Sequence, residues 1–333
     1  MYNLKRKSHL PATIAALLLM AITACTPPAT YRTLEGGVWN TLYRVTYRAD
    51  KDLQDTILAA MKSVEMSLSP FAEGSLISAV NRGDTSVRAD RHLRRVFEAS
   101  QEVNRLSHGA FDPTVAPLVN LWGFGYKSGQ GDPSPEAIDS LLPTVGLAEC
   151  SIRADGSVVR KSHRTEFNFS AITKGYGCDM VGRALERNGV TDYLVEIGGE
   201  IAARGVSARG VKWRVSIDAP VESDTSIVHE RMAVIEIGGC GVATSGNYRN
   251  YRRGADGKVW HTISPVTGRP ALTDLLSATV VAPSCMLADA LATSCMAMES
   301  RQALAMIDSI PDTEAMLVTA DTTLTTAGFP LTR

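Results

Sequence analysis

The sequence predicts an α+β fold in which mixed sheets are flanked by helices. Apolar residues recur every three or four positions at 53–69 and 92–109, which indicates two helices that each bury one face. Alternating or short apolar runs indicate strands at 192–200, 211–220, 232–246, 277–284 and 314–320. Because these helices and strands do not alternate strictly, the α+β class is favoured over a regular βαβ arrangement.

The remaining segments follow from turn residues and from further helical patterns. Residues 69–84 are expected to form a loop and then a short helix. Residues 109–125 hold two prolines and three glycines among aromatic residues, which predicts a loop with fixed turns and no regular structure. A helix is expected over 173–189, and the Gly198-Gly199 pair is expected to turn the chain. Two more helices are expected at 286–298 and 301–311.

The composition is that of an ordinary globular protein. The chain has 333 residues, of which 44% are hydrophobic and 21% charged, and its formal net charge is −1. This length suits one large domain or two smaller ones. No nucleic-acid partner is expected, because the chain has neither a basic net charge nor a lysine and arginine stripe to hold a polyanion.

The N-terminus has the features of a bacterial secretion signal. Lys5, Arg6 and Lys7 precede a short apolar run that is too short for a comfortable membrane span. Cys25 follows Ile22-Thr23-Ala24, an arrangement that resembles a lipobox. An ordinary signal peptide with a chance cysteine is the alternative.

We therefore expect residues 1–24 to be a lipoprotein signal peptide, 25–35 a tether, and 36–333 the folded domain. Lipidated Cys25 would anchor the exported protein to a bacterial membrane, facing the periplasm. Five cysteines follow in the mature chain, and their small or apolar neighbours predict buried, unreactive thiols. Their odd number names no disulfide pair, and no Cys/His cluster has the spacing of a zinc site.

Residues 167–180, FNFSAITKGYGCDM, predict a strand end that turns into a helix. A helix N-terminus binds anions such as phosphate. Lys174 in the first turn would oppose the helix dipole, which makes sense if a negatively charged ligand binds nearby. An exposed lysine at a strand–helix turn is the alternative.

Residues 288–294, ADALATS, place Asp289 and Thr293 one helical turn apart in a segment expected to be buried. Two side-chain oxygens on one helix face, together with a backbone carbonyl, suit Mg²⁺. A helix cap at Asp289 and a Thr293 hydroxyl bonded back to a carbonyl are the alternative.

His261 follows a Gly/Ser turn expected at residues 244–246 and precedes a strand-like segment. Beside a phosphate site, this histidine would serve as a general base. A structural role for a lone histidine is the alternative.

Six segments then occur in a recognisable order: GAFDPTVAPLVNLWGFG, AITKGYGCDM, LVEIGGEI, VATSGNYRNY, HTISPVTGRP, and SATVVAP with LADALATS. Together they resemble the ApbE-type FAD:protein FMN transferases, a family once described as thiamine-biosynthesis lipoproteins. The resemblance covers about residues 36–325 and implies an ApbE-like, T-fold-related architecture.

The resemblance implies an enzyme that moves the FMN half of FAD onto a Thr or Ser hydroxyl and releases AMP with the help of Mg²⁺. The acceptor would be an exported loop of a membrane electron-transport protein, such as a subunit of sodium-pumping NADH:quinone oxidoreductase or of an Rnf-type complex. His261 and Asp289 would be catalytic, and the metal ligands would be the Ala171 carbonyl, Asp289 and Thr293. The flavin-side contacts carry over to Trp39, Phe71, Ala110, Phe111, Asp112, Asn168, Lys174 and Ile263.

The chain also departs from the family pattern. Acidic positions of relatives are occupied here by Leu76, Asn168, Ser264 and Ala292, and the last change leaves one carboxylate fewer for a second Mg²⁺. Two other functions therefore stay open. The same site would act as a Mg²⁺-dependent FAD diphosphatase with water as acceptor, or the protein would be a non-catalytic flavin-binding lipoprotein.

Overall fold

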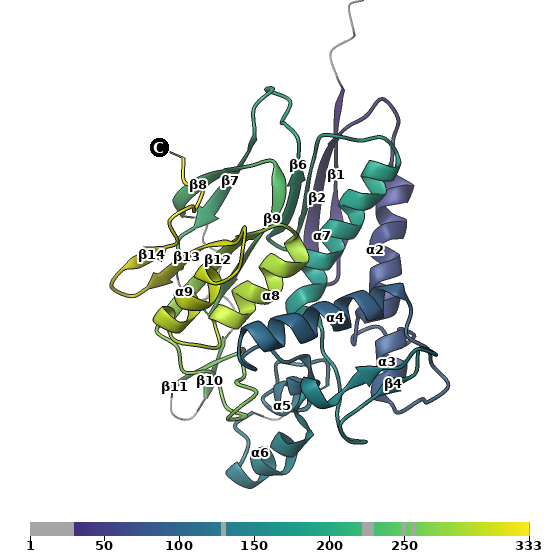
Figure 1. Ribbon diagram of the computed structural model, residues 1–333, viewed down its shortest axis with the longest axis vertical. Helices are drawn as coiled ribbons and strands as arrows, with labels where there is room; N and C mark the ends of the chain where they lie inside the picture. Colours follow the sequence, from purple (N-terminus) through teal and green to yellow (C-terminus); the bar gives the residue numbers. More distant parts are fainter. Residues whose placement is uncertain (1–29, 128–130, 222–229, 248–250, 255–256, 333) are drawn as a thin grey trace, which may run out of the picture.

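One eight-stranded antiparallel sheet organises the protein (Figure 1). The computed structural model describes residues 30–332, apart from 128–130, 222–229, 248–250 and 255–256. In spatial order the sheet contains β1 (Tyr31–Val38), β2 (Thr41–Arg48), β5 (Tyr193–Ile197), β6 (Glu200–Arg204), β9 (Gly239–Gly246), β12 (Leu275–Ala282), β13 (Glu314–Thr319) and β14 (Thr323–Thr325). Three two-stranded sheets join β3 (Ser151–Ile152) to β4 (Val158–Val159), β7 (Trp213–Asp218) to β8 (Arg231–Ile237), and β10 (Tyr251–Gly254) to β11 (Gly257–Trp260).

Helices cover one face of the large sheet, and the β7–β8 hairpin covers the other (Figure 1). The described α-helices are α2 (Gln54–Leu68), α3 (Leu76–Asn81), α4 (Arg91–Leu106), α5 (Ala116–Leu121), α6 (Pro135–Leu141), α7 (Ser170–Arg187), α8 (Cys285–Cys295) and α9 (Ser300–Asp308). Strand β12 is buried along almost its whole length because apolar side chains pack on both of its faces. This accounts for its continuous apolar sequence.

The α+β prediction is confirmed, and all strand pairs among the described residues are antiparallel rather than mixed. Most predicted helices and strands are present, with ends that differ by a few residues, and the run at 232–246 forms two strands, β8 and β9. The strand end predicted at Phe167 and Phe169 is wrong, because the Phe167 backbone is bonded by the Asn81 side chain and residues 165–169 form no strand. Gly198 and Gly199 both adopt positive φ, as the predicted turn between β5 and β6 requires. The Thr244-Ser245-Gly246 stretch is not a turn but the end of β9, where Thr244 pairs with Thr279 of β12.

The prediction of an irregular loop at 109–125 is wrong. A 3₁₀ turn at Pro113–Val115 leads directly into helix α5. Both Pro113 and Pro117 lie in the first turn of their helical segment, where a backbone N–H would have no helical partner. Proline at these positions starts a helix rather than breaking it.

The predicted buried thiols are confirmed among the described cysteines. All five are free, and four of them are buried, while Cys240 is half-buried. Strand β1 begins at Tyr31, so residues 31–35 of the expected tether lie within the folded domain. The signal segment 1–24 and Cys25 lie outside the described residues.

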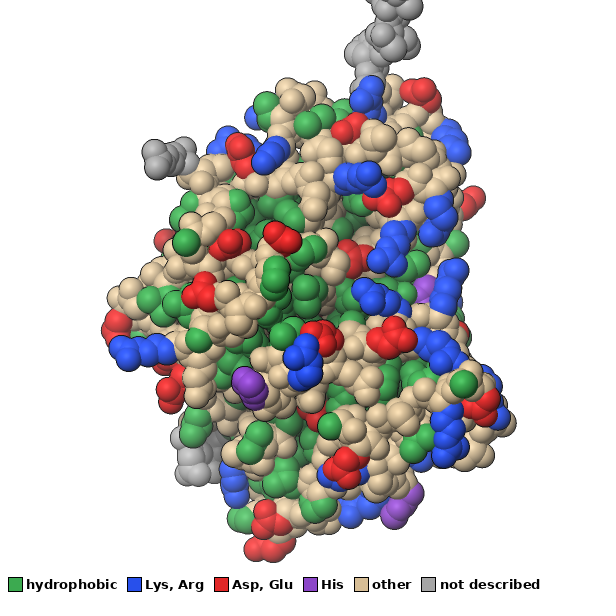
Figure 2. All heavy atoms as spheres, in the orientation of Figure 1, with side chains coloured by type: hydrophobic (Ala, Val, Ile, Leu, Met, Phe, Trp, Pro, Cys, Tyr) green, Lys and Arg blue, Asp and Glu red, His purple; other side chains and the backbone are tan. Residues whose placement is uncertain are grey.

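The surface mixes charges of both signs. On the face drawn in Figure 2, Lys and Arg side chains are interspersed with Asp and Glu, in keeping with the net charge of −1. In the described part of the chain, no helix combines the length and the apolar character needed to cross a membrane.

Candidate active site

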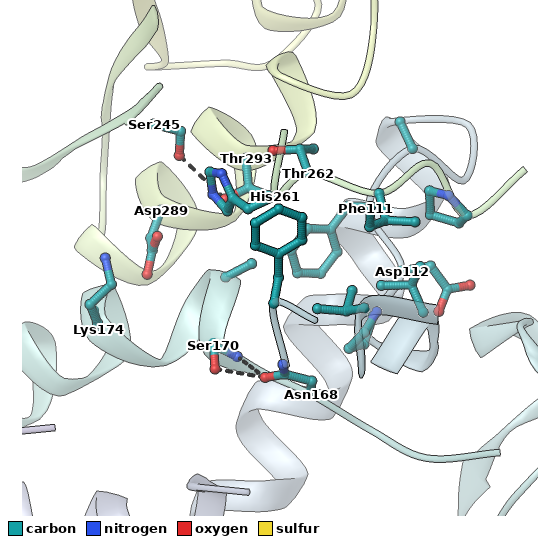
Figure 3. A pocket seen from close by; sticks show the side chains of 18 of the residues that line it. Phe111, Asp112, Asn168, Ser170, Lys174, Ser245, His261, Thr262, Asp289 and Thr293 are labelled. Carbon is teal, nitrogen blue, oxygen red and sulfur yellow. Dashed lines mark hydrogen bonds between the residues drawn. The ribbon is translucent and has the colours of Figure 1, made fainter. Parts of the chain in front are cut away.

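A cavity of about 430 Å³ lies between α7, α8 and two loops, and it collects nearly all the residues singled out from the sequence (Figure 3). Lys174 and Asp289 lie on one side of it, and Phe111 and Asp112 lie on the other. The predicted residues that line this cavity are Phe71, Ala110, Phe111, Asp112, Asn168, Ala171, Lys174, His261, Ile263, Asp289 and Thr293.

Helices α7 and α8 approach each other closely because glycine occupies position 175. A Cβ atom there would lie 2.2 Å from the carbonyl oxygen of Cys285, which is far inside van der Waals contact. The carboxylate of Asp179 accepts hydrogen bonds from the N–H groups of Cys285 and Met286, at 2.9 and 3.0 Å. These contacts fix the register of the two helices and therefore the positions of the site residues on them.

Asp289 faces α7 from the middle of α8. Its carboxylate is 2% exposed and accepts a hydrogen bond of 2.9 Å from the N–H of Gly175. In a regular helix the Gly175 N–H points at the carbonyl of Ala171, four residues earlier. The Asp289 carboxylate therefore lies on the same side of α7 as that carbonyl. The helix cap of α8 is Ser284, and the capping interpretation of Asp289 is therefore wrong.

Thr293 extends the same face of α8 by one turn. Its hydroxyl lies 3.3 Å from the hydroxyl of Ser245 at the end of β9. The Ala171 carbonyl, Asp289 and Thr293 all line the cavity. Three oxygen donors, one of them charged, suit a small hard cation that keeps other positions for water and phosphate.

These three oxygen donors do not form a cluster of acidic, histidine or cysteine side chains. Among the described residues, no group of three or more His, Cys, Asp or Glu side chains is arranged to hold a metal ion. The expected set contains a single carboxylate and depends on a carbonyl and a hydroxyl instead. A second buried carboxylate, Glu200, lines the same cavity, and no described residue donates a hydrogen bond to its Oε2 atom. This excess of buried negative charge fits Mg²⁺.

Lys174 is neither in the first turn of α7 nor an exposed surface lysine. It is the fifth residue of α7, its side chain is 34% exposed, and its ammonium pairs with Oε1 of Glu200. Burial lowers the pKa of Lys174, but the carboxylates of Glu200 and Asp289 outweigh this and hold the pKa above its ordinary value. Lys174 therefore carries its charge in the cavity.

Both carboxylates beside Lys174 have raised pKa values. Burial and the neighbouring Asp289 raise the pKa of Glu200 to about 7, against the opposing effect of Lys174. Burial also raises the pKa of Asp289, although Lys174 and the Gly175 N–H oppose the shift. One cation shared between two buried carboxylates leaves the ionised cluster with a net negative charge.

His261 reaches the cavity from the loop after β11. Its ring meets Phe124 edge to face, with 6.4 Å between the ring centroids. The loop is held by a bridge between Ile263 and Pro270, and by the indole N–H of Trp122, which donates to the Gly268 carbonyl at 2.8 Å. The imidazole is therefore presented by a braced turn rather than by a free loop.

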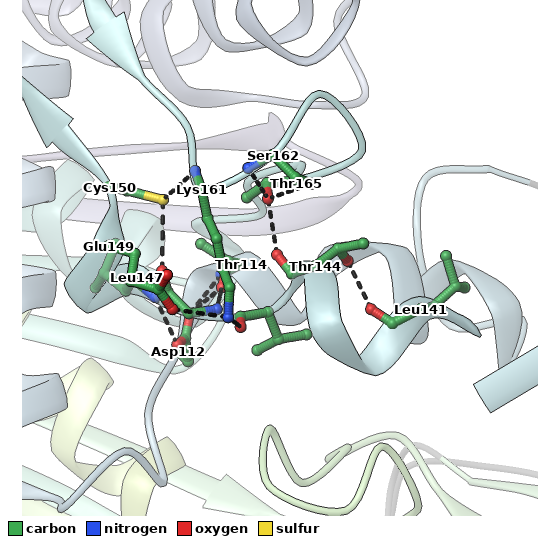
Figure 4. A network of polar contacts seen from close by, with 12 residues as sticks. Asp112, Thr114, Leu141, Thr144, Leu147, Glu149, Cys150, Lys161, Ser162 and Thr165 are labelled. Atoms are coloured by element: carbon green, nitrogen blue, oxygen red, sulfur yellow. Dashed lines mark hydrogen bonds and ion pairs between the residues drawn. The ribbon is translucent and has the colours of Figure 1, made fainter. Parts of the chain in front are cut away.

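Asp112 holds the loop at 110–113 in place (Figure 4). One carboxylate oxygen accepts from the N–H and hydroxyl of Thr114, at 2.8 and 2.5 Å, and the other accepts from the Leu147 N–H at 2.9 Å. Burial raises the pKa of this carboxyl group, and these hydrogen bonds oppose the shift. Because both oxygens are engaged, Asp112 acts as a brace that sets the backbone of Ala110 and Phe111 against the cavity.

Asn168 organises the entry to α7. Its side-chain oxygen accepts from the N–H and hydroxyl of Ser170, at 2.9 and 2.6 Å. The backbone N–H of Asn168 donates to the carbonyl of Pro113. The amide thus makes the local turn that a carboxylate at this position would also make. Phe71, which also lines the cavity, is 65% exposed and lies edge to face with Tyr126.

Comparison with known proteins identifies the family. The model of the ApbE family matches residues 39–317. The chain belongs to the ApbE family. It is 33% identical over 318 residues to the FAD:protein FMN transferase of Vibrio cholerae, covering 92% of this chain and 93% of the relative. It is 31% identical to the protein of the same name from Haemophilus influenzae, covering 90% and 89% of the two chains.

Solved ApbE structures share the fold. The flavin transferase ApbE from Vibrio cholerae superposes with a TM-score of 0.80 at 31% identity, covering 91% of this chain and 99% of that one. The apo form of Pseudomonas stutzeri flavinyl transferase ApbE gives a TM-score of 0.78 at 29% identity, covering 90% and 94%. The ApbE-like architecture expected from the motifs is confirmed.

One expected contact of this ApbE protein lies elsewhere. Trp39 is not among the residues that line the cavity. It occupies a positive-φ turn between β1 and β2 and packs against α7, where a Cβ on Gly177 would meet its ring at 2.4 Å. Its indole N–H is buried without a hydrogen-bond partner.

Several cavity residues of this ApbE protein were not singled out as site residues from the sequence. The most important is Glu200, which lies in the quoted LVEIGGEI motif but received no role. The signal was present, because a carboxylate after a Gly-Gly turn directly precedes the apolar run Ile201-Ala202-Ala203 of a strand. The others are Pro113, Val115, Val119, Phe124, Ser170, Gly198, Thr244, Ser245, Gly246, Thr262 and Pro265.

Proposed function

We propose that this ApbE-family protein transfers the FMN moiety of FAD to a Thr or Ser hydroxyl of an acceptor protein, with Mg²⁺, and releases AMP. The observation that carries the proposal is the single cavity shared by His261, Lys174 and the Asp289–Thr293 pair, which come from three separate parts of the chain. The names of the relatives, FAD:protein FMN transferases, support the same reaction.

The reaction makes one phosphoester bond and breaks one phosphoanhydride bond. The acceptor oxygen attacks the phosphorus of the FMN half, the P–O bond to the AMP half breaks, and AMP leaves with the bonding electrons. The imidazole of His261 takes the hydroxyl proton, and the Lys174 ammonium binds phosphate oxygens. When bound, Mg²⁺ supplies positive charge that stabilises the phosphates and the leaving group, and the Ala171 carbonyl, Asp289 and Thr293 would hold it.

The apolar part of the cavity suits an aromatic ring system. Phe71, Phe111, Phe124 and Ile263 line it, and Phe71 is the most exposed of them. Flat apolar side chains stack on flavin or adenine rings without requiring polar partners. This side would bind and orient FAD, while the polar side performs the transfer.

The N-terminal pattern supports an exported, lipid-anchored protein that faces the periplasm. Residues 1–24 would be removed and Cys25 lipidated, which places the enzyme beside membrane-bound acceptors. A subunit of sodium-pumping NADH:quinone oxidoreductase or of an Rnf-type complex fits this location. Radiolabelled palmitate incorporated into wild-type protein but not into Cys25→Ala would support the anchor, and labelling of neither would contradict it.

Mass spectrometry on an acceptor fragment tests the transfer. The protein from residue 30, FAD, Mg²⁺ and a fragment containing the target Thr would be incubated with and without chelator. A chelator-sensitive mass gain equal to FMN is expected. Accumulation of AMP and free FMN without a mass gain would establish the diphosphatase instead, and intact FAD with every acceptor tried would establish a flavin-binding protein.

His261→Ala tests the proton acceptor. We expect transfer to slow by about 100-fold or more, while the Kd for FAD changes little, because the imidazole acts on the acceptor hydroxyl. His163→Ala, at an exposed position outside the cavity, is the matched control. Equal losses in FAD binding and transfer would make His261 a binding residue.

A further inference from the structure

Glu200 is a buried acid in the cavity that takes no part in the proposed transfer, although its partner Lys174 does. Its side chain is 5% exposed, and its Oε1 atom pairs with the ammonium of Lys174. Within the described part of the chain, its buried Oε2 atom has no hydrogen-bond partner. A buried carboxylate with an unpaired oxygen is costly to maintain, even at this position where Glu200 pairs with Ile197 at the β5–β6 turn.

Lys174 lies between two buried carboxylates but pairs with only one of them. Among the described residues it makes an ion pair with Glu200 within 4.0 Å and none with Asp289, although its charge acts on both carboxylates. From the residues that the structure describes, Asp289 receives one hydrogen bond, donated by the Gly175 N–H. The Asp289 carboxylate is therefore left open toward the cavity.

We propose that Glu200 is a positioning residue that holds the Lys174 ammonium away from Asp289 and so keeps Asp289 available to a divalent cation. Without the Glu200 charge, Lys174 turns to Asp289, the remaining buried carboxylate, and competes with the cation for it. Glu200 also keeps the three-residue cluster net negative, which favours cation entry. This inference rests on the cation site of the proposed function.

The turn before Glu200 supports this role. Gly198 and Gly199 have φ values of +65° and +101°, and a Cβ on Gly198 would lie 3.3 Å from the side chain of Lys174. The turn therefore lets the lysine stem pass close to the backbone on its way to Glu200. The glycine pair and the turn that it forms thus direct the Lys174 side chain toward Glu200.

Mn²⁺ binding to FAD-free protein, followed by electron paramagnetic resonance with Mg²⁺ competition, tests the inference without relying on activity. We expect Glu200→Gln to weaken Mn²⁺ binding at least tenfold, and Lys174→Met to bind Mn²⁺ more tightly than wild type. The double variant should recover to within about threefold of wild type, because the competing ammonium is gone. Glu166→Gln, which removes another Glu–Lys pair that does not line the cavity, should bind Mn²⁺ as wild type does.

Unchanged Mn²⁺ binding in Glu200→Gln would overturn the proposal, as would a double variant as weak as Glu200→Gln. If Glu200→Gln fails to fold, Lys174→Met alone decides, because weaker or unchanged binding there contradicts competition by Lys174. Absence of Mn²⁺ binding in wild type would overturn the cation site and this inference together. The flavinylation assay, which is read from the acceptor mass, judges the transfer separately.

Discussion

The two sides of the cavity are built in different ways. The helix side carries Asp289 and Glu200, which are 2% and 4% exposed, on elements packed backbone to backbone at Gly175. The aromatic side carries Phe71, which is 65% exposed, and other residues that come from loops. The contrast indicates that the charges are placed in advance, where a wrong position would cost most, while the exposed ring of Phe71 has room to adjust to a ligand.

The largest expected effect is on the helix side, at Asp289. Asp289→Asn keeps the size of the side chain and an acceptor for the Gly175 N–H but removes the charge. We expect FMN transfer to fall by about 1,000-fold, because the residue would no longer hold the cation. Asp308→Asn, at an exposed position at the end of α9, is the control. Full activity of Asp289→Asn would remove Asp289 from the metal site.

The next effect should come from forcing α7 and α8 apart. Gly175→Ala places a methyl group against the Cys285 carbonyl. We expect a loss of about 3 kcal/mol in the free energy of unfolding, measured in urea, with a fall in transfer of about 100-fold. Gly74→Ala, whose Cβ would meet only Met66 at 3.7 Å, should be neutral. Wild-type stability in Gly175→Ala would show that the helix side also adjusts.

The aromatic side should respond more weakly. Phe71→Ala removes an exposed ring at the rim of the cavity, and we expect the Kd for FAD to rise by about tenfold with unchanged stability. Fluorescence titration with FAD measures this directly. Val211→Ala, a half-exposed apolar residue that does not line the cavity, is the control. An effect as large as that of Asp289→Asn would erase the distinction between the two sides.

The smallest effect is a pH dependence within the helix side. Burial raises the pKa of Asp179 to about 6, although its hydrogen bonds from Met286 and Cys285 oppose the shift. A carboxyl group whose pKa is higher in the folded state binds more protons there, so its contribution to stability falls as pH rises from about 4 to 6. Wild-type protein should therefore lose more stability than Asp179→Asn over this range in urea titrations. Parallel curves would contradict the assignment.

Local sequence patterns were sufficient for most of the fold. Helix α2 and strand β12 follow from the spacing of apolar residues, because that spacing determines which face of an element can be buried. The error at 109–125 arose because proline was taken as a breaker, although its effect depends on the position within the helix. Motif resemblance then supplied 11 of the 23 residues that line the cavity.

Contacts between distant segments could not be predicted in this way. Nothing local to Lys174 shows that its partner is Glu200, and nothing local to Asp289 shows that it accepts from Gly175. The placement of Trp39 against α7 likewise depends on a glycine at 177. These contacts depend on how the elements pack, which no spacing along one segment encodes.

The register between α7 and α8 has a consequence for how the protein matures. The hydrogen bonds that set it join residues 106 and 114 positions apart, and α8 lies near the end of the chain. Contacts of such long range form late, after large loops have closed. Until α8 docks, Lys174 of α7 and Glu200 of β6 stay in contact with water, and the cavity that they line is incomplete. The residues that would hold the cation are thus brought together only when folding is complete, and a newly made chain that lacks a docked α8 has no assembled cavity.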